Sequence, residues 1–257
     1  MDKGPPGKFL ITGCARTGTS LTLLLMSYFK GLKIDPTVEA PPLLFKKHDV
    51  LKKPQGEDGL VQNKLIHPKR GPLFITQTLV DFIKQNIKLI VMVRNAKDVL
   101  VSKHANNKGK YWCTPQRWVN SVNQLLDCLS YVNENNLQNH LHIILYEDLT
   151  TNLASEINKL QKFVGLPISP TYKEFYTKPI GIDEPYRERY EATSEGNFRV
   201  SLNQTVEALN GLRPVEPNSE KWKAPEHRQR IHEVMSGPYG KQINSLLKKF
   251  YETDKPF

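Results

Sequence analysis

Glycines, hydroxyls and one arginine stand close together near the start of the sequence, between Gly13 and Ser20. The segment reads GCARTGTS, which fits the spacing G-x-x-x-x-G-x-S. Glycines let the backbone turn tightly and approach an anion, and the backbone N–H groups of the loop and of a following helix then point at that anion. The hydroxyls of Thr17, Thr19 and Ser20 add further donors. The pattern predicts a loop that binds a phosphate.

The position after the second glycine of this loop is occupied by Thr19, where nucleotide kinases and other NTPases carry a lysine for the outer phosphates. The nearest cation is Arg16, inside the loop. Such enzymes also hold Mg²⁺ through a carboxylate on another strand. The clearest buried strand ends in Arg94, although Glu147 and Asp148 follow another strand and imitate such a carboxylate. Thr19 in place of the lysine, and Arg94 in place of a carboxylate, disfavour an ATP- or GTP-dependent enzyme. Such an enzyme stays the alternative.

A second group of chemically capable residues follows the central strand, in the segment VMVRNAKDVLVSKHANN at 91–107. Arg94 stands at the strand end, and Ser102 lies about two turns into the next helix. A guanidinium and a hydroxyl so placed are suited to a second, separate phosphate. Asp98 falls in the first turn of that helix, where an acidic side chain suits the helix dipole.

The elements that must position these residues alternate between strands and helices, which predicts an α/β fold with a central parallel sheet flanked by helices. IKLIVMV is the clearest strand, because it is apolar throughout and rich in β-branched residues. Strands are expected at 8–13, 60–66, 87–93 and 141–146, and helices at 19–30, from Gly71–Pro72 through 86, from Ala96, at 115–135 and at 148–164.

The remaining segments are less regular. Residues 35–59 are rich in proline, glycine and charge, and we expect an irregular segment that lies over the site. The C-terminal third reads as helices and loops. With no internal repeat and no linker-like tract, we expect a single domain over 1–257.

Composition narrows the class of protein and of ligand. The chain has a formal net charge of +10 and a pI of about 9.4, which suits an anionic ligand, but its basic residues form no run typical of a nucleic-acid-binding arm. Cys14, Cys113 and Cys128 have neither metal-binding spacing nor an even number, which favours a reducing compartment. We see no signal peptide and no spanning segment. We therefore expect a cytoplasmic protein without nucleic-acid or membrane partners.

Three segments together resemble the sulfotransferases that use 3′-phosphoadenosine 5′-phosphosulfate (PAPS). The segments GCARTGTSLT, VRNAKDVLVS and LYEDLTTNLASEINKLQKFVGLP look like landmarks of that family, and they occur in its order over roughly residues 8–167. The resemblance implies a P-loop NTPase-like three-layer sandwich. It also implies transfer of a sulfuryl group to a hydroxyl or amine acceptor, with 3′-phosphoadenosine 5′-phosphate (PAP) as product and no metal required.

The resemblance also implies roles for individual residues. The loop would hold the 5′-phosphosulfate, with Arg16 matching the cation that many carbohydrate and protein sulfotransferases place there. Arg94 and Ser102 would grip the 3′-phosphate, and Tyr146 would lie near the nucleotide. The donor-binding positions in the loop are then Cys14, Ala15, Arg16, Thr17, Gly18, Thr19 and Ser20.

Two features depart from the family pattern. The C-terminal R-K-G segment is absent, and GLRPVEPNSEKWK stands where a further cation is expected, with Arg213 as our candidate beside Lys221, Trp222 and Lys223. Leu21 replaces the tryptophan that packs on adenine in cytosolic members, so the adenine pocket must be built differently.

The catalytic base and the acceptor stay open. His67, in NKLIHP, matches the histidine of cytosolic members with one extra residue after Lys64, while Glu39 matches the glutamate of carbohydrate and tyrosine sulfotransferases. Histidine transfers protons near neutral pH, whereas a glutamate base would need its pKa raised by burial. His48 and His104 are weaker candidates.

Acceptors of several kinds fit the sequence: a carbohydrate, a phenol, a small metabolite or a peptide. Tyr111, Trp112 and Trp118 either line the acceptor pocket or pack in the core. A third reading is a non-catalytic binder of sulfated or phosphorylated ligands that keeps the fold.

Overall fold

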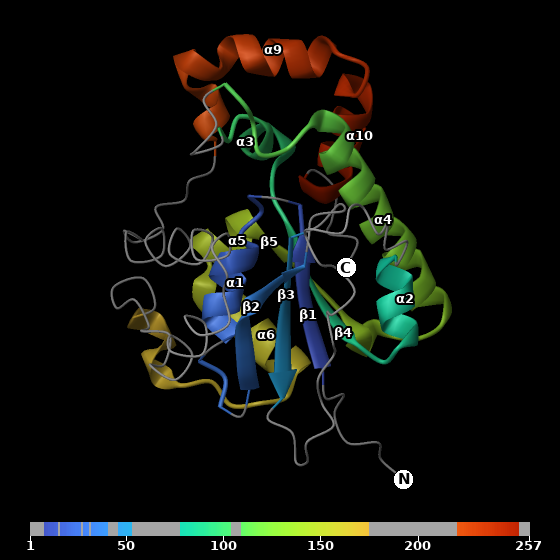
Figure 1. Ribbon diagram of the computed structural model, residues 1–257, viewed down its shortest axis with the longest axis vertical. Coiled ribbons are helices and arrows are strands. Elements are labelled where there is room, and N and C mark those ends of the chain that lie inside the picture. Colours follow the sequence, from blue (N-terminus) through green and yellow to red (C-terminus); the bar gives the residue numbers. More distant parts are fainter. Residues whose placement is uncertain are drawn as a thin grey trace.

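Figure 1 shows the computed structural model of the 257-residue chain. The structure describes residues 8–14, 16–26, 28–30, 32–40, 46–52, 78–103, 109–174 and 220–251. Over the described residues, five strands form one sheet with helices packed on both of its faces.

The sheet has the order β2-β3-β1-β4-β5 and is mixed. Strands β1 (Lys8–Gly13), β4 (Lys88–Val93) and β5 (Leu141–Leu145) are parallel, as the sequence predicted. Strand β3 (Lys46–Lys52) runs antiparallel to β1, and β2 (Leu32–Ala40) runs antiparallel to β3. All six residues of β4 are buried, because helices cover both faces of the sheet.

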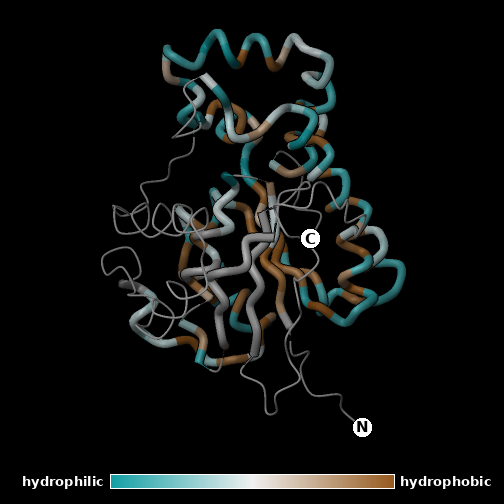
Figure 2. Tube along the Cα trace, viewed as in Figure 1, coloured by the Kyte–Doolittle hydropathy of each residue, from teal (hydrophilic) through white to brown (hydrophobic). Residues whose placement is uncertain are grey.

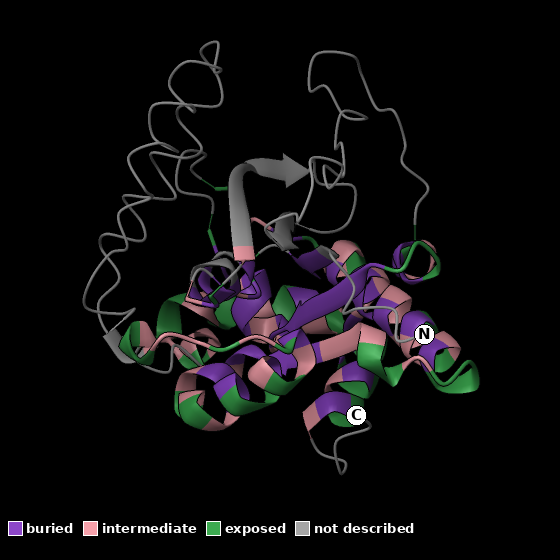
Figure 3. Ribbon diagram, turned by 90° about the horizontal axis from the view of Figure 1, so that it is seen from below, coloured by how far each residue is buried: buried purple, intermediate pink, exposed green. Residues whose placement is uncertain are grey.

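Alternate residues of the parallel strands point into two separate apolar clusters. Leu89, Val91 and Val93 of β4 join one cluster, and Ile90 and Met92 join the other. Helices α2 (Leu79–Lys84), α4 (Pro115–Glu134) and α10 (Gly240–Tyr251) complete the first, and α1 (Thr19–Met26), α5 (Tyr146–Thr151) and α6 (Leu153–Val164) complete the second. Figure 3 shows the buried strands between these helices, and Figure 2 shows polar residues along the outer helices.

Local signals set the helix ends. Thr114 caps α4 by accepting the backbone N–H of Arg117 at 3.2 Å, and Pro115 occupies the first turn. Helix α6 ends at Gly165, which adopts the left-handed conformation typical of a helix C-terminus. Helix α3 (Ala96–Leu100) and helix α9 (Arg228–Ser236) lie together at one end of the molecule (Figure 1). Short 3₁₀ helices cover Gln138–His140 (η1), Pro170–Glu174 (η2), Lys221–Lys223 (η3) and Pro225–His227 (η4).

Two expectations from the sequence were wrong. Part of the segment 35–59, expected to be irregular, lies in β2 and β3, a hairpin at the sheet edge. An edge strand tolerates Pro36, because one row of its N–H groups needs no partner. The single helix expected at 148–164 is two helices that meet at Asn152, whose φ of −136° and ψ of 50° are not helical. The strand expected at 60–66 lies outside the described residues, as does the first part of the helix expected from Gly71.

Candidate active site

The predicted phosphate loop joins β1 to α1 and depends on close backbone approaches. A Cβ at Gly13 would lie 2.6 Å from the Met92 carbonyl oxygen, so only glycine fits beside β4 there. Gly18 has a φ of +100°, and a Cβ on it would lie 2.8 Å from the Tyr146 ring. The loop is closed by Thr17, whose backbone N–H and hydroxyl both donate to the Cys14 carbonyl, at 3.2 and 2.7 Å.

Arg16 stands at the exposed bend of this loop. Its backbone has a φ of +72°, the left-handed region that residues other than glycine seldom adopt. The Arg16 guanidinium lies 5.9 Å from the ring centre of Trp112. Partial burial of this guanidinium and then repulsion from Arg94 lower the pKa of Arg16. The loop therefore presents a cation beside another cation, with an aromatic ring on one side.

Arg94 connects the loop to the second motif. It follows β4 directly, is 6% exposed, and donates from its Nη1 to the Arg16 carbonyl at 3.1 Å. Its guanidinium lies 3.9 Å from the centre of the Tyr146 ring, a cation–π geometry. Because β1, β4 and β5 are parallel, Gly13, Arg94 and Tyr146 meet at one edge of the sheet, where open α/β sheets bind ligands.

Ser102 lies just after α3 and is buried with its hydroxyl in a short chain of hydrogen bonds. Its Oγ donates to the Asp98 carbonyl at 3.0 Å and accepts from Lys221 Nζ at 2.5 Å. The Ser102 hydroxyl, which the sequence predicts to bind a phosphate, therefore contacts a polar group from the C-terminal part of the chain.

Lys221 is a candidate site residue that the sequence analysis named but did not choose. The expected C-terminal cation was Arg213, which lies outside the described residues. Burial, and then repulsion from Arg94 and Arg16, lower the pKa of the Lys221 ammonium to about 8, while Asp98 acts in the opposite direction. The Trp-Lys pair in EKWK was the available signal, and Lys221 immediately precedes that tryptophan.

Other site residues serve the structure around these cations. Both carboxylate oxygens of Glu147 accept hydrogen bonds, from the Asn95 backbone N–H at 3.0 Å and from the Tyr251 hydroxyl at 2.9 Å. Burial raises the pKa of Glu147. These bonds tie the end of α10 to the strand ends that carry the site.

The aromatic residues near the site differ in burial, and two cysteines near the site are buried. Trp118 is 1% exposed and donates from Nε1 to the Arg94 carbonyl at 3.3 Å, so it packs in the core, whereas Tyr111 and Trp112 are half-buried. The Sγ atoms of Cys14 and Cys113 lie 3.0 Å apart as thiols, and that contact together with burial raises the pKa of Cys113.

The structure does not bring every predicted residue into view. His67, Ala15 and the alternative His104 lie outside the described residues. Glu39 is placed by its backbone in β2, opposite His48 of β3. Ser20 is the second residue of α1. Within the described part of the chain, no group of three or more histidine, cysteine or acidic residues could hold a metal ion, and no helix is long and apolar enough to cross a membrane.

Comparison with known proteins gives matches to sulfotransferases. The chain matches the model of the sulfotransferase domain over residues 6–188. It is 29% identical to Sulfotransferase 1A1 of Rattus norvegicus over 62% of this chain and 60% of the rat protein. It is 33% identical to Sulfotransferase 1A1 of Canis lupus familiaris over 35% of this chain and 34% of the dog protein.

These matches cover part of each protein. The chain spans less than two thirds of the length of these relatives, and no solved structure gives a significant match to it. The family model nevertheless includes the loop, Arg94, Ser102 and Tyr146, and it ends before Lys221. Because the model matches most of the sequence, the chain belongs to the sulfotransferase domain family.

Proposed function

We propose that the protein transfers a sulfuryl group from PAPS to a hydroxyl or amine acceptor and releases PAP. The observation that carries this proposal is the convergence of Arg16, Arg94 and Lys221 with the Ser102 hydroxyl at the carboxyl edge of the parallel strands. Membership of the sulfotransferase family supports the same activity.

The residues present fit a ligand with two separated anionic groups. Burial, and then repulsion from neighbouring cations, lowers the pKa of both Lys221 and Arg16, and a bound anion would relieve that repulsion. Arg16 and the loop N–H groups would hold the 5′-phosphosulfate. Arg94, Ser102 and Lys221 would hold the 3′-phosphate. The Tyr146 ring packs against the Arg94 guanidinium.

The chemistry assigned to these residues is electrostatic. PAPS supplies the activated sulfuryl group, whose leaving group is a phosphate oxygen. Arg16 and the loop stabilise negative charge on the oxygens that leave or are transferred, and they hold the donor in line with the acceptor. His67 and Glu39 stay the two candidates for the base that removes the acceptor proton, and carbohydrate, phenol and small-metabolite acceptors all fit this scheme.

A nucleotide kinase or other NTPase is the alternative, and it needs a carboxylate for Mg²⁺. Glu147 and Asp148 were the residues that imitate one. The two oxygens of Glu147 accept hydrogen bonds from the Asn95 N–H and the Tyr251 hydroxyl, which gives Glu147 a structural use. This arrangement counts against Glu147 as a Mg²⁺ ligand.

The proposal also covers the fold and the location of the protein. We assign the chain to the P-loop NTPase-like three-layer sandwiches as one domain over 1–257, supported by the loop after β1 and by helices on both sheet faces. A cytoplasmic location is supported by the cysteines, Cys14, Cys113 and Cys128, which have neither metal-binding spacing nor an even number.

Calorimetric titration tests the proposal. PAP without metal should bind more tightly than ADP with Mg²⁺, and Arg94→Ala should weaken PAP binding by about 10- to 100-fold, as expected for lost charge-assisted hydrogen bonds. Preference for ADP with Mg²⁺ would replace the sulfotransferase by the kinase. PAP binding without transfer from PAPS to any member of an acceptor panel would favour the non-catalytic binder.

A further inference from the structure

Asp98 is a buried carboxylate that binds a distant segment of the chain. It is 1% exposed, and its oxygens accept the backbone N–H of Glu220 at 2.9 Å and of Trp222 at 3.2 Å. Burying a carboxylate is costly unless charge-assisted hydrogen bonds or a nearby cation compensate. Here the bonds go to two N–H groups of the same turn, on either side of Lys221.

This turn would not hold its shape by itself. Glu220 has a φ of +71°, a left-handed conformation that is unfavourable for a residue other than glycine. The Asp98 carboxylate fixes the two N–H groups that flank the Lys221 side chain, and the Lys221 ammonium donates to Ser102. The lysine is thus aimed at the serine by the backbone bonds beside it.

The backbone of Asp98 acts on the other partner of the same contact. Its carbonyl accepts the Ser102 hydroxyl at 3.0 Å, four residues along the chain. One residue therefore positions both members of the Ser102–Lys221 pair, the serine through its carbonyl and the lysine through its carboxylate. Asp98 also supplies negative charge that opposes the repulsion of Lys221 by Arg94 and Arg16.

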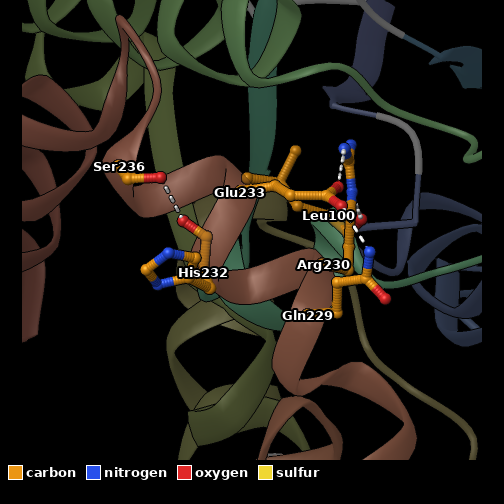
Figure 4. Close-up of polar contacts among 6 residues, drawn as sticks. All are labelled: Leu100, Gln229, Arg230, His232, Glu233 and Ser236. Carbon is orange, nitrogen blue, oxygen red and sulfur yellow. Dashed lines mark hydrogen bonds and ion pairs between the residues drawn. The ribbon is translucent and has the colours of Figure 1, made fainter.

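Further contacts hold the same C-terminal segment against α3. The Lys97 ammonium lies 4.3 Å from the ring centre of Trp222. Arg230, on α9, donates from Nε to the Leu100 carbonyl at 3.5 Å and lies over Tyr111 at 4.1 Å. Figure 4 shows Arg230 reaching from α9 to Leu100. The Nη1 atom of Arg230 also lies 3.9 Å from Oε2 of Glu233. These contacts fix the segment around the turn, whereas Asp98 fixes the turn itself.

We propose that Asp98 is a positioning residue for donor recognition, which locks the 220–222 turn so that Lys221 reaches the 3′-phosphate beside Ser102. The proposal rests on the proposed function, because it assumes that a 3′-phosphate binds there. It assigns to Asp98 selectivity for a nucleotide with a 3′-phosphate over the same nucleotide without one.

The test compares PAP with 5′-AMP, which lacks the 3′-phosphate, by calorimetric titration of the full chain. Asp98→Asn keeps one acceptor oxygen but turns an NH₂ group toward a backbone donor, so it should break one of the two bonds to the turn. We expect PAP affinity to fall by about 10- to 100-fold, the range for a lost hydrogen bond to a charged group, and 5′-AMP affinity to change by less than about threefold. Asp98→Glu keeps the charge and should restore part of the selectivity.

Asp81→Asn is the matched control. Asp81 also accepts a backbone N–H, that of Thr78 at 2.7 Å, but it lies at the exposed start of α2. This variant should lower stability without changing the ratio of PAP to 5′-AMP affinity. In a Lys221→Gln background, Asp98→Asn should add less than about threefold, because its effect passes through Lys221.

The outcomes separate the two proposals. A wild-type protein without preference for PAP over 5′-AMP would refute the proposed function before any variant is compared. A wild-type preference that survives in Asp98→Asn, or equal loss of both ligands in that variant, would overturn the role of Asp98 alone. Should Asp98→Asn fail to fold, Lys221→Gln leaves α3 intact and must itself lose the preference for PAP, or the inference is wrong.

Discussion

Gly18 offers a direct test of how the loop is built, through the substitution Gly18→Ala. An L-residue at a φ of +100° costs about 1–3 kcal/mol. The new Cβ would lie 2.8 Å from the Tyr146 ring, which is itself buried beneath the Arg94 guanidinium at 3.9 Å. Moving that ring weakens a cation–π contact worth about 0.5–2 kcal/mol. The alanine also reduces the freedom of the unfolded chain, which returns about 0.4–1 kcal/mol.

Taken at the middle of their ranges, these contributions leave a net cost of about 2–3 kcal/mol for Gly18→Ala. The Gly18 carbonyl also accepts the Thr22 N–H at 3.0 Å and so begins α1, which limits how far the loop can relax. We expect the cost in the free energy of unfolding, measured by urea denaturation. A loop that relaxes locally instead should lose PAP affinity by an equivalent factor of about 30- to 150-fold.

Gly165→Ala is the matched control for this substitution. Gly165 also has a positive φ, +72°, but a Cβ there has no neighbour within 4 Å and lies at the end of α6, away from the site. It should cost about 1 kcal/mol and leave PAP binding unchanged. If both alanine variants lose the same unfolding free energy within about 0.5 kcal/mol and both bind PAP normally, the contact with Tyr146 has no energetic role and the reasoning fails.

Three further predictions concern the charges. Arg16→Ala should lower turnover of PAPS by about 10²-fold or more, by analogy with losing one oxyanion donor, and near-normal turnover in steady-state assays would refute its role. Burial, and then repulsion from Arg94 and Arg16, lower the pKa of Lys221 to about 8, while Asp98 acts in the opposite direction, so PAP binding at pH 9 should take up a proton. Calorimetry in two buffers of different ionisation enthalpy detects this uptake, which Lys221→Gln must abolish. Burial and then Lys159 lower the pKa of His142 to about 4, so its unfolded form binds protons more readily. The wild type should therefore lose up to about 3 kcal/mol more unfolding free energy than His142→Phe as pH falls from 6.5 to 4, and parallel profiles would contradict this.

The parallel part of the sheet was predictable because its signal is local. The residues of β4 are all buried between two helical layers, so the sequence there is apolar throughout. The hairpin of β2 and β3 was not predictable in the same way. Its residues include Pro36 and several charges, which local propensity assigns to loops, and its pairing with β1 is set by tertiary structure.

The site divides along the same line. Arg94 and Ser102 lie eight positions apart around one strand end and one short helix, so the sequence alone could single them out, and their joint binding of a phosphate stays a prediction. Lys221 is 119 residues from Ser102, and no periodicity relates them. The bond from Lys221 to Ser102, and the bonds from the flanking turn to the Asp98 carboxylate, which the sequence suggested only as a partner of the helix dipole, show that Lys221 is brought there.

The glycine-rich loop and the segment after β4 are joined by the bond from Arg94 to the Arg16 carbonyl. A glycine-rich turn alone needs no cation behind it, yet a buried guanidinium, that of Arg94, donates to the carbonyl of the strained residue Arg16. Arg94 lies near two other cations; the Glu147 carboxylate interacts with Arg94, and the Asp98 carboxylate interacts with Lys221. The oxygens of both carboxylates also accept hydrogen bonds, those of Glu147 from Asn95 and Tyr251 and those of Asp98 from the 220–222 turn. A bound polyanion would add negative charge beside the three cations, so we expect PAP to raise the protein's stability as well as to bind it.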